Sequence, residues 1–307
     1  MSQVHDLIII GSGPAGLAAS IYASRAELDT IVIEKHMMSG GQIINTYEVD
    51  NYPGIPGISG FDLAVKFREH CEKLGATFVE GDVVNFTIEE EIKKVTLDSG
   101  EAYYAKAVII ATGAVTRKLG VKGEEEFSGL GVSYCATCDG AFFKNKTTAV
   151  VGGGDVAVED AIYLARLCKR VYVIHRRNEF RAVKTLVSQL TKLDNVEIIW
   201  DTVVEEIKGT EVVTGIELKN VKTQENSHIP VDGVFIAVGY NPASEVYKEV
   251  IELDSHGYIV ADESCETNVQ GVYAAGDIRT KALKQIITAA ADGANAITSV
   301  ERYLATV

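Results

Sequence analysis

The sequence has no long hydrophobic run. None of its apolar stretches reaches the roughly 18 to 20 residues that an α-helix needs to cross a bilayer. The first six residues carry no basic cluster, and the apolar stretch that follows ends at once in glycine-rich turn residues, so we expect no signal peptide. Positive charge is also scarce, because 43 acidic residues against 29 basic ones give a net charge of −14. General nucleic-acid binding needs clustered Lys and Arg, so we expect a cytoplasmic protein that binds neither membrane nor nucleic acid.

Cysteine is also scarce, with five in 307 residues, an odd number that does not suit a secreted disulfide scaffold. Only Cys135 and Cys138 have C-x-x-C spacing, and no second pair supplies the other ligands of a structural zinc site, so we predict no metal. A C-x-x-C motif beside βαβ patterns indicates a redox-active pair. Cys71 and Cys168 lie in segments with a helical pattern and are expected to be packed in the core. Cys265 is assigned no role.

A nucleotide-binding fingerprint stands near the N-terminus. A β-branched run, residues 6–10, leads into Gly11-Ser12-Gly13-Pro14-Ala15-Gly16 and then a helical stretch through residue 25. In this pattern the first glycine permits a tight turn, the second lets a pyrophosphate approach the backbone, and the third lets the helix pack against the strand. A second strand, residues 30–33, ends in Glu34, a carboxylate placed to accept hydrogen bonds from ribose hydroxyls.

A second fingerprint follows the cysteine pair. The strand at residues 148–151 leads into Gly152-Gly153-Gly154-Asp155-Val156-Ala157 and a helix expected from about Ala157 to Cys168. The next strand, residues 170–174, ends in His175-Arg176-Arg177, with Arg181 beyond. Arginine forks bind a phosphate in a bidentate manner. The second site is therefore expected to prefer NADP, whereas the carboxylate of the first suits an unphosphorylated ribose such as that of FAD.

The two halves of the chain repeat one plan of fingerprint, helix, β-rich insert and returning strand. The returning strands are expected at residues 107–113 and 233–239, and the chain closes with a strand before Gly276-Asp277 and a helix from about Leu283. This order predicts an α/β protein with two Rossmann-like, three-layer domains, the second inserted into the first. The expected domains are residues 1–115 with 246–307 for FAD and 116–245 for NADPH. The connecting segments, near 114–117 and 241–244, are expected to act as a hinge.

These motifs together resemble the bacterial-type, low-molecular-weight thioredoxin reductases, class II of the pyridine nucleotide-disulfide oxidoreductases. The resemblance covers nearly the whole chain, and its most specific motif is Cys-Ala-Thr-Cys-Asp. The motifs that carry it are Gly11-Ser12-Gly13-Pro14-Ala15-Gly16, Gly40-Gly41-Gln42, Ala111-Thr112-Gly113, Cys135-Ala136-Thr137-Cys138-Asp139, Gly152-Gly153-Gly154, His175-Arg176-Arg177 with Arg181, and Ala275-Gly276-Asp277. The resemblance implies one FAD, a homodimer, NADPH as donor, and thioredoxin or a thioredoxin-like disulfide protein as acceptor.

The resemblance also implies roles for individual residues. NADPH would reduce FAD, FAD would reduce the Cys135–Cys138 disulfide, and the dithiol would reduce thioredoxin. Cys138 would face the flavin, Cys135 would attack thioredoxin, and Asp139 would act as general acid or base. The FAD contacts would be Gly11, Ser12, Gly13, Pro14, Ala15, Gly16, Glu34, Lys35, Gly41, Gln42, Asn51, Val83, Ala111, Thr112, Gly113, Gly276, Asp277, Lys284, Gln285 and Ile286. The NADPH contacts would be Gly152, Gly154, Asp155, Val156, Ala157, His175, Arg176, Arg177 and Arg181. A rotation of the domains about the hinge would expose the dithiol.

Two positions depart from the family pattern. Lys284 stands where the family usually has arginine, and Val156 replaces the usual hydroxyl residue after Asp155. Among alternative functions, the flavin subunit of alkyl hydroperoxide reductase shares the core. Its extra N-terminal dithiol module is not expected here, since the chain begins ten residues before Gly11. A ferredoxin-driven variant would lack a working NADPH site, and a ferredoxin–NADP reductase would lack the cysteine pair. A non-catalytic redox or nucleotide sensor is the alternative from another class.

Overall fold

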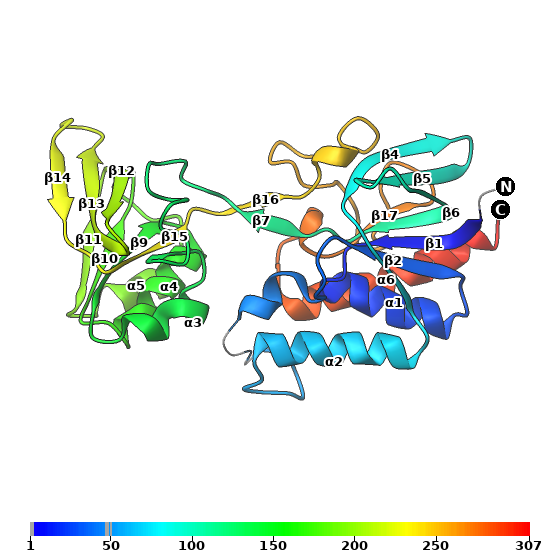
Figure 1. Ribbon diagram of the computed structural model, residues 1–307, viewed down its shortest axis with the longest axis horizontal. Coiled ribbons are helices and arrows are strands. Elements are labelled where there is room, and N and C mark those ends of the chain that lie inside the picture. The colour runs from blue at the N-terminus through cyan, green and yellow to red at the C-terminus, as the bar shows by residue number, and fades with distance from the viewer. Residues whose placement is uncertain (1–2, 47–48, 50) are drawn as a thin grey trace. The chain divides into compact units, whose positions relative to one another are not determined.

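The computed structural model describes residues 3–46, 49 and 51–307, with the backbone alone at 45, 137 and 138. The chain forms two compact units, one of Met1–Val115 with Asn241–Val307 and the other of Thr116–Tyr240. The second unit is thus inserted into the first, and both are α/β (Figure 1). The second junction, between Tyr240 and Asn241, lies slightly before the boundary expected at residue 245. Within the described part, none of the helices combines the length and apolar composition of a membrane crossing.

The first unit is built on a seven-stranded sheet of order β3-β2-β1-β6-β5-β4, with β17 also paired to β6. Strands β1, β2, β3, β6 and β17 run parallel, and β4 and β5 join antiparallel beside β6. The elements are β1 (Val4–Ile10), α1 (Pro14–Arg25), β2 (Thr30–Glu34), the 3₁₀ helix η1 (Gly41–Asn45), α2 (Gly60–Lys73), β3 (Thr77–Glu80), β4 (Val83–Glu89), β5 (Ile92–Leu97), β6 (Ala102–Ile110), η3 (Glu245–Tyr247), β17 (Val272–Ala274), η4 (Gly276–Ile278) and α6 (Ile286–Leu304).

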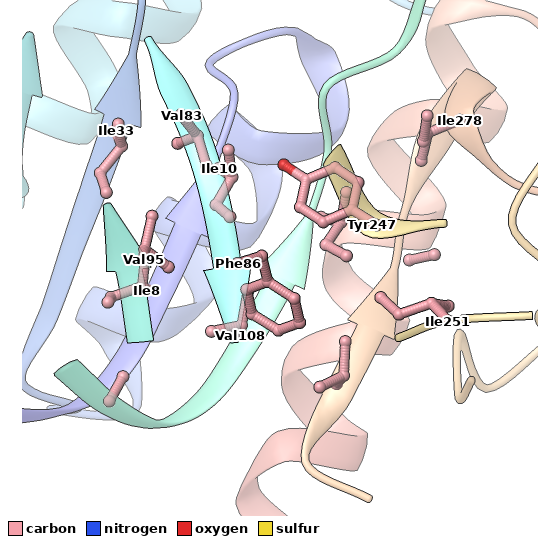
Figure 2. Close-up of a cluster of buried hydrophobic side chains, with 14 of the residues drawn as sticks. Ile8, Ile10, Ile33, Val83, Phe86, Val95, Val108, Tyr247, Ile251 and Ile278 are labelled. Atoms are coloured by element: carbon pink, nitrogen blue, oxygen red, sulfur yellow. The ribbon is translucent and has the colours of Figure 1, made fainter. Parts of the chain in front are cut away.

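Both faces of this sheet are buried, which explains the unbroken apolar runs of its central strands. Successive side chains of a strand point to opposite faces, so Leu7 and Ile9 of β1 belong to one cluster and Ile8 and Ile10 to another. The first cluster packs under α1 and α6, whose alanine-rich faces approach closely; a Cβ on Gly293 would collide with the backbone of α1. The second cluster gathers Ile8, Ile10 and aromatic side chains from β4 and η3 (Figure 2).

The second unit has a five-stranded parallel sheet of order β11-β10-β9-β15-β8 and a three-stranded antiparallel sheet, β12-β13-β14. Its elements are β8 (Val132–Ser133), α3 (Ala136–Asp139), η2 (Gly140–Phe143), β9 (Thr147–Gly152), α4 (Asp155–Ala165), β10 (Arg170–Ile174), α5 (Lys184–Leu190), β11 (Val196–Ile199), β12 (Thr202–Gly209), β13 (Val213–Asn220), β14 (Asn226–Ile229) and β15 (Gly233–Ala237). Ala149 and Val151 of β9 pack toward β12 and β13, while Val150 packs toward α4, so the unit has three layers.

Two helix boundaries differ from the prediction. Helix α4 begins at Asp155 and ends at Ala165, so Cys168 lies in the turn beyond it, although it is buried as expected. The residues after Ala165 make i→i−3 hydrogen bonds, such as Arg166 N to Tyr163 O. These bonds are of the 3₁₀ type, so the α-helix ends there. Helix α6 begins at Ile286 because Gln285 is extended and caps it.

The two sheets share a strand order that places both glycine loops alike. Each begins with three parallel strands in 3-2-1 order, β3-β2-β1 in the first unit and β11-β10-β9 in the second. Ligands of such sheets bind beyond the carboxyl ends of the strands. The units are connected by β7 (Ala114–Thr116) and β16 (Tyr240–Pro242), which pair in a sheet of their own.

Candidate active site and cofactor sites

The first glycine loop turns from β1 into α1 with almost no room for side chains. Gly11 has φ +101°, and a Cβ there would press on the carbonyl of Ala111, while a Cβ on Gly16 would collide with the carbonyl of Gly11. Gly13 differs, because a Cβ there would meet no described atom within 4 Å. Gly13 is the N-cap of α1, and no side chain caps this helix end. The N–H groups of the first turn can therefore donate to a bound anion.

Residues from the other strand ends gather around this loop. Glu34, at the tip of β2, accepts hydrogen bonds from the N–H of Ser12 at 2.8 Å and from its hydroxyl at 2.7 Å. Gly40 N donates to Ser12 O at 2.7 Å, and a Cβ on Gly41 would lie 3.4 Å from Gly13. The fold thus brings Glu34, Gly41 and the end of β6 to the loop, as the sequence predicts for a dinucleotide site.

Asp277 lies at the carboxyl end of β17, beside the same loop. The adjacent Gly276 has φ +81°, and a Cβ there would be 2.9 Å from the Cβ of Ala15. Burial raises the pKa of Asp277, and Lys284 and Lys281 oppose this shift. Its Oδ1 is one of four buried side-chain oxygens that have no hydrogen-bond partner among the described residues, and the other three are hydroxyls. A buried carboxylate oxygen without a donor fits a ligand hydroxyl.

The Lys284 ammonium contacts the backbone beside Asp277 and an aromatic ring. Its Nζ donates to the carbonyl of Asp277 at 2.8 Å and lies 3.2 Å from the centre of the Tyr258 ring. Burial lowers the pKa of Lys284 to about 8. Lysine at this position therefore braces the chain around Asp277.

The remaining residues expected at the FAD site are spread along the same edge of the unit. Asn51 Nδ2 donates to Gln285 Oε1 at 2.8 Å, and Gln42 Nε2 donates to Ala114 O at 2.7 Å, so side chains far apart in sequence meet here. Thr112 donates to Ala243 O, and Gly113 has φ +66°. Ile286 packs against the cluster of α2, and Val83 is buried in the core shown in Figure 2. Lys35 is exposed.

These observations fit a flavin dinucleotide. The glycine turn leaves space for a pyrophosphate at a helix N-terminus, Glu34 lies where a ribose would follow, and Asp277 offers a buried acceptor for a polyol chain.

Gly13→Ala is expected to separate folding from cofactor binding. Alanine suits the backbone of Gly13, with φ −72° and ψ −176°, and its methyl group meets no described atom, so the free energy of unfolding should change by no more than about 1 kcal/mol. The methyl group would occupy the place of the pyrophosphate, so FAD affinity should fall by about tenfold or more. Flavin content and thermal unfolding of the purified variant measure the two effects. Gly16→Ala is the contrasting variant, because its methyl group collides with Gly11 and should lower stability itself. Unchanged flavin content in Gly13→Ala would contradict the assignment.

The second glycine loop turns from β9 into α4 in the same way. A Cβ on Gly152 would collide with the carbonyl of Ala237, whereas one on Gly154, the N-cap of α4, would meet no described atom within 4 Å. Oδ1 of the exposed Asp155 accepts a hydrogen bond from Val183 N at 2.8 Å. Ala157 is buried at the third fingerprint position, and Val156 is exposed.

Three exposed arginines lie near this loop. Arg176 and Arg177 follow His175, the first residue after β10. The N–H of Arg181 donates to Gly153 O at 2.8 Å and so ties Arg181 to the loop. His175 beside them is buried, packs under Gly153 and bonds to Glu179 O at 3.0 Å. Burial lowers the pKa of His175, and Arg176 and Arg177 lower it further. The imidazole is therefore a neutral packing group, while the arginines supply the positive charge.

The dithiol motif forms a short helix, α3, in the same unit as the second glycine loop. Cys135 is disulfide-bonded in this structure, whereas Cys71, Cys168 and Cys265 are free and buried. Only the backbone of Cys138 is described, so the role expected of its side chain lies outside the described residues. Asp139 Oδ2 accepts a hydrogen bond from the Ser133 hydroxyl at 2.6 Å.

Ser133 was not singled out from the sequence. Its buried hydroxyl oxygen also accepts from Cys135 N at 3.1 Å, so one side chain links the acid and the cysteine backbone. Glu124 was also missed; it is buried and accepts from Tyr134 OH at 2.8 Å and from two backbone N–H groups, fixing the segment that leads into Cys135. No spacing rule marks either residue, although a serine two positions before a C-x-x-C motif lies within reach of it.

Comparison with known proteins agrees with this architecture. A family model described as pyridine nucleotide-disulphide oxidoreductase matches residues 5–293. The chain belongs to that family. It is 48% identical over 303 residues to a thioredoxin reductase of Listeria monocytogenes, covering 98% of this chain and 94% of that protein. The crystal structure of the Lactococcus lactis thioredoxin reductase superposes with a TM-score of 0.87 at 41% identity, covering 99% and 100% of the two chains. That of T. acidophilum thioredoxin reductase gives 0.83 at 35% identity, covering 99% of each chain.

Proposed function

We propose that this chain is an NADPH-dependent thioredoxin-disulfide reductase. In the net reaction NADPH, a proton and thioredoxin disulfide give NADP⁺ and thioredoxin dithiol, a transfer of two electrons and two protons. The observation that carries the proposal is a disulfide-bonded Cys135 and a hydrogen-bonded Asp139 in the same unit as a glycine loop with three exposed arginines nearby. The 48% sequence identity with a thioredoxin reductase over 98% of this chain supports the choice of acceptor.

The first unit would hold FAD and the second NADPH. The loop Gly11–Gly16, Glu34 and Asp277 would bind FAD, and Gly154, Arg176, Arg177 and Arg181 would bind NADPH, with the arginines on its 2′-phosphate. Bound FAD supplies two-electron transfer between the nicotinamide and the disulfide. The exposed positive charge of the arginines favours NADPH over NADH, because guanidinium groups can pair with the extra 2′-phosphate of NADPH. The first glycine loop has Glu34 at the corresponding position, a carboxylate that offers no such positive partner.

The dithiol would act through thiol–disulfide exchange. In the reduced enzyme the Cys135 thiolate attacks a sulfur of thioredoxin disulfide, forming a mixed disulfide and releasing one thioredoxin thiolate. Cys138 then attacks Cys135, releasing the second thioredoxin thiolate and restoring the enzyme disulfide. Asp139, held by Ser133, takes and returns the protons of these thiols.

Two further properties belong to the proposal. The enzyme would be a homodimer, as the family resemblance implies, and light scattering would test that. It would act in the cytoplasm, where thioredoxin keeps protein thiols reduced.

Anaerobic addition of NADPH, and separately NADH, tests the proposal directly. We expect the purified protein to carry flavin that NADPH bleaches, and thioredoxin disulfide to restore its absorbance. Trp200, the single tryptophan, lies 6.1 Å from His175 between ring centroids, so we expect its fluorescence to change when a nucleotide binds to the second unit. Nucleotide binding without bleaching would reject NADPH as donor, and reduced ferredoxin would then be tested. Bleaching without reoxidation by thioredoxin would reject the acceptor.

A further inference from the structure

A buried group of charges lies behind the Gly276–Asp277 turn. Asp292, in the middle of α6, is 3% exposed, and Arg279 is 2% exposed. The two form a bidentate pair, with Arg279 Nε 2.9 Å from Oδ2 of Asp292 and Nη2 2.8 Å from Oδ1. Lys281 Nζ adds a third bond, 2.7 Å from Oδ2. Such a cluster is unusual in a protein interior, because moving charged groups out of water costs free energy that their pairing must offset.

The carboxylate accepts a fourth hydrogen bond, and this one connects it to the proposed FAD site. Gly276 N donates to Asp292 Oδ2 at 2.9 Å. This bond fixes a residue at φ +81° that lies against the first turn of α1. It is next to the buried Oδ1 of Asp277, which has no hydrogen-bond partner among the described residues. Lys281 Nζ also donates to Thr288 O, and this second bond fixes the start of α6.

The charges fit a carboxylate that stays ionised. Burial alone raises the pKa of Asp292, but bonds from Arg279, Lys281 and Gly276 N outweigh it, so the pKa lies below its usual value. An ionised acceptor makes the stronger hydrogen bond to a backbone N–H.

We propose that Asp292, neutralised by Arg279 and Lys281, is a positioning residue that holds the Gly276–Asp277 turn in the conformation that binds FAD. The inference rests on the proposed function, which assigns Asp277 to FAD, and adds a residue that does not touch the cofactor. An acid within the small-residue run of α6 is the sequence signal that could have found it.

Three variants of the full-length holoprotein separate positioning from general stability. Asp292→Ala removes every acceptor. Asp292→Asn keeps one oxygen where Gly276 N can donate. The double variant Asp292→Leu with Arg279→Met removes the acceptor without leaving that arginine buried and unpaired. Ser299→Ala is the matched control, because Ser299 is a buried residue of the same helix whose hydroxyl bonds to Ser264 O at 2.9 Å, away from Gly276.

The readouts are the FAD dissociation constant, from flavin fluorescence on serial dilution, and NADP⁺ binding followed through Trp200. We expect Asp292→Ala and the double variant to weaken FAD binding by about tenfold or more, the effect of one lost charge-assisted bond. Asp292→Asn should regain most of the affinity, and Ser299→Ala should stay within about twofold of wild type. NADP⁺ binding should not change in any variant.

Wild-type FAD affinity in both Asp292→Ala and the double variant would overturn the inference and leave the proposed function intact. An equal loss of affinity in Ser299→Ala would overturn it as well, because general loosening of α6 would then explain the effect. A wild-type chain that bound no FAD would overturn the proposed function and the inference with it.

Discussion

Cys135→Ser is expected to abolish reduction of thioredoxin by NADPH while the protein keeps its flavin. A serine hydroxyl is not ionised at neutral pH and cannot form a disulfide, so the exchange reaction loses its nucleophile. Removal of a catalytic nucleophile lowers kcat by at least about 10³-fold in well-studied enzymes. Bleaching of the flavin by NADPH should persist, since the nucleotide loop and Arg176 are untouched. Stopped-flow absorbance separates the two half-reactions in one experiment.

The other cysteines are not expected to substitute for Cys135. Burial raises the pKa of Cys71 to about 11 and that of Cys265 to about 12, so both remain protonated thiols at neutral pH. Cys168, also buried with a raised pKa, offers a matched control, and Cys168→Ala should turn over at the wild-type rate. Substantial thioredoxin reduction by Cys135→Ser would show that electrons leave the enzyme by another path.

The double variant Arg176→Ala with Arg177→Ala is expected to lower kcat/KM for NADPH by about 10²-fold and to leave kcat/KM for NADH nearly unchanged. Hydrogen bonds to charged groups contribute about 1.5–3 kcal/mol each, and we take the lower part of that range because both side chains are exposed. Steady-state kinetics with the two nucleotides give the ratio.

Arg170 provides the control for this prediction. It lies at the opposite end of the same strand, is exposed, and pairs with Glu197. Arg170→Ala removes the same charge from the protein without changing the carboxyl end of β10, so the NADPH to NADH ratio should be that of wild type. An unaltered ratio in the Arg176, Arg177 double variant would place the 2′-phosphate elsewhere.

Local rules located the two loops and most of the strands from the sequence. Gly11 and Gly16 are required by backbone geometry within a few residues, and the β-branched runs of β1 and β9 are typical of strands buried on both faces. The prediction of an α/β protein with an inserted second Rossmann-like unit is confirmed by the fold and by the solved structures that it resembles.

Interactions between distant segments could not be predicted in the same way. The bond from Asn51 to Gln285 and the bond from Gly276 to Asp292 depend on which helix the fold brings to which turn. The contact of Ser133 with Asp139 is closer in sequence, yet it depends on the bend between β8 and α3. The start of α4 at Asp155 differs from the predicted start near Ala157 for a related reason. Its N-cap, Gly154, has no side chain that could mark the helix start in the sequence.

The insertion of one unit into the other has a consequence for biosynthesis. Residues 116–240 are contiguous, so the second unit can fold as soon as it leaves the ribosome. The first unit cannot, because β17 and α6, which complete its sheet and cover α1, are translated only after the insert. Asp277 and Asp292 both belong to this late segment. Flavin incorporation would then be among the last events in the maturation of the chain, after the nucleotide loop of the second unit is already in place.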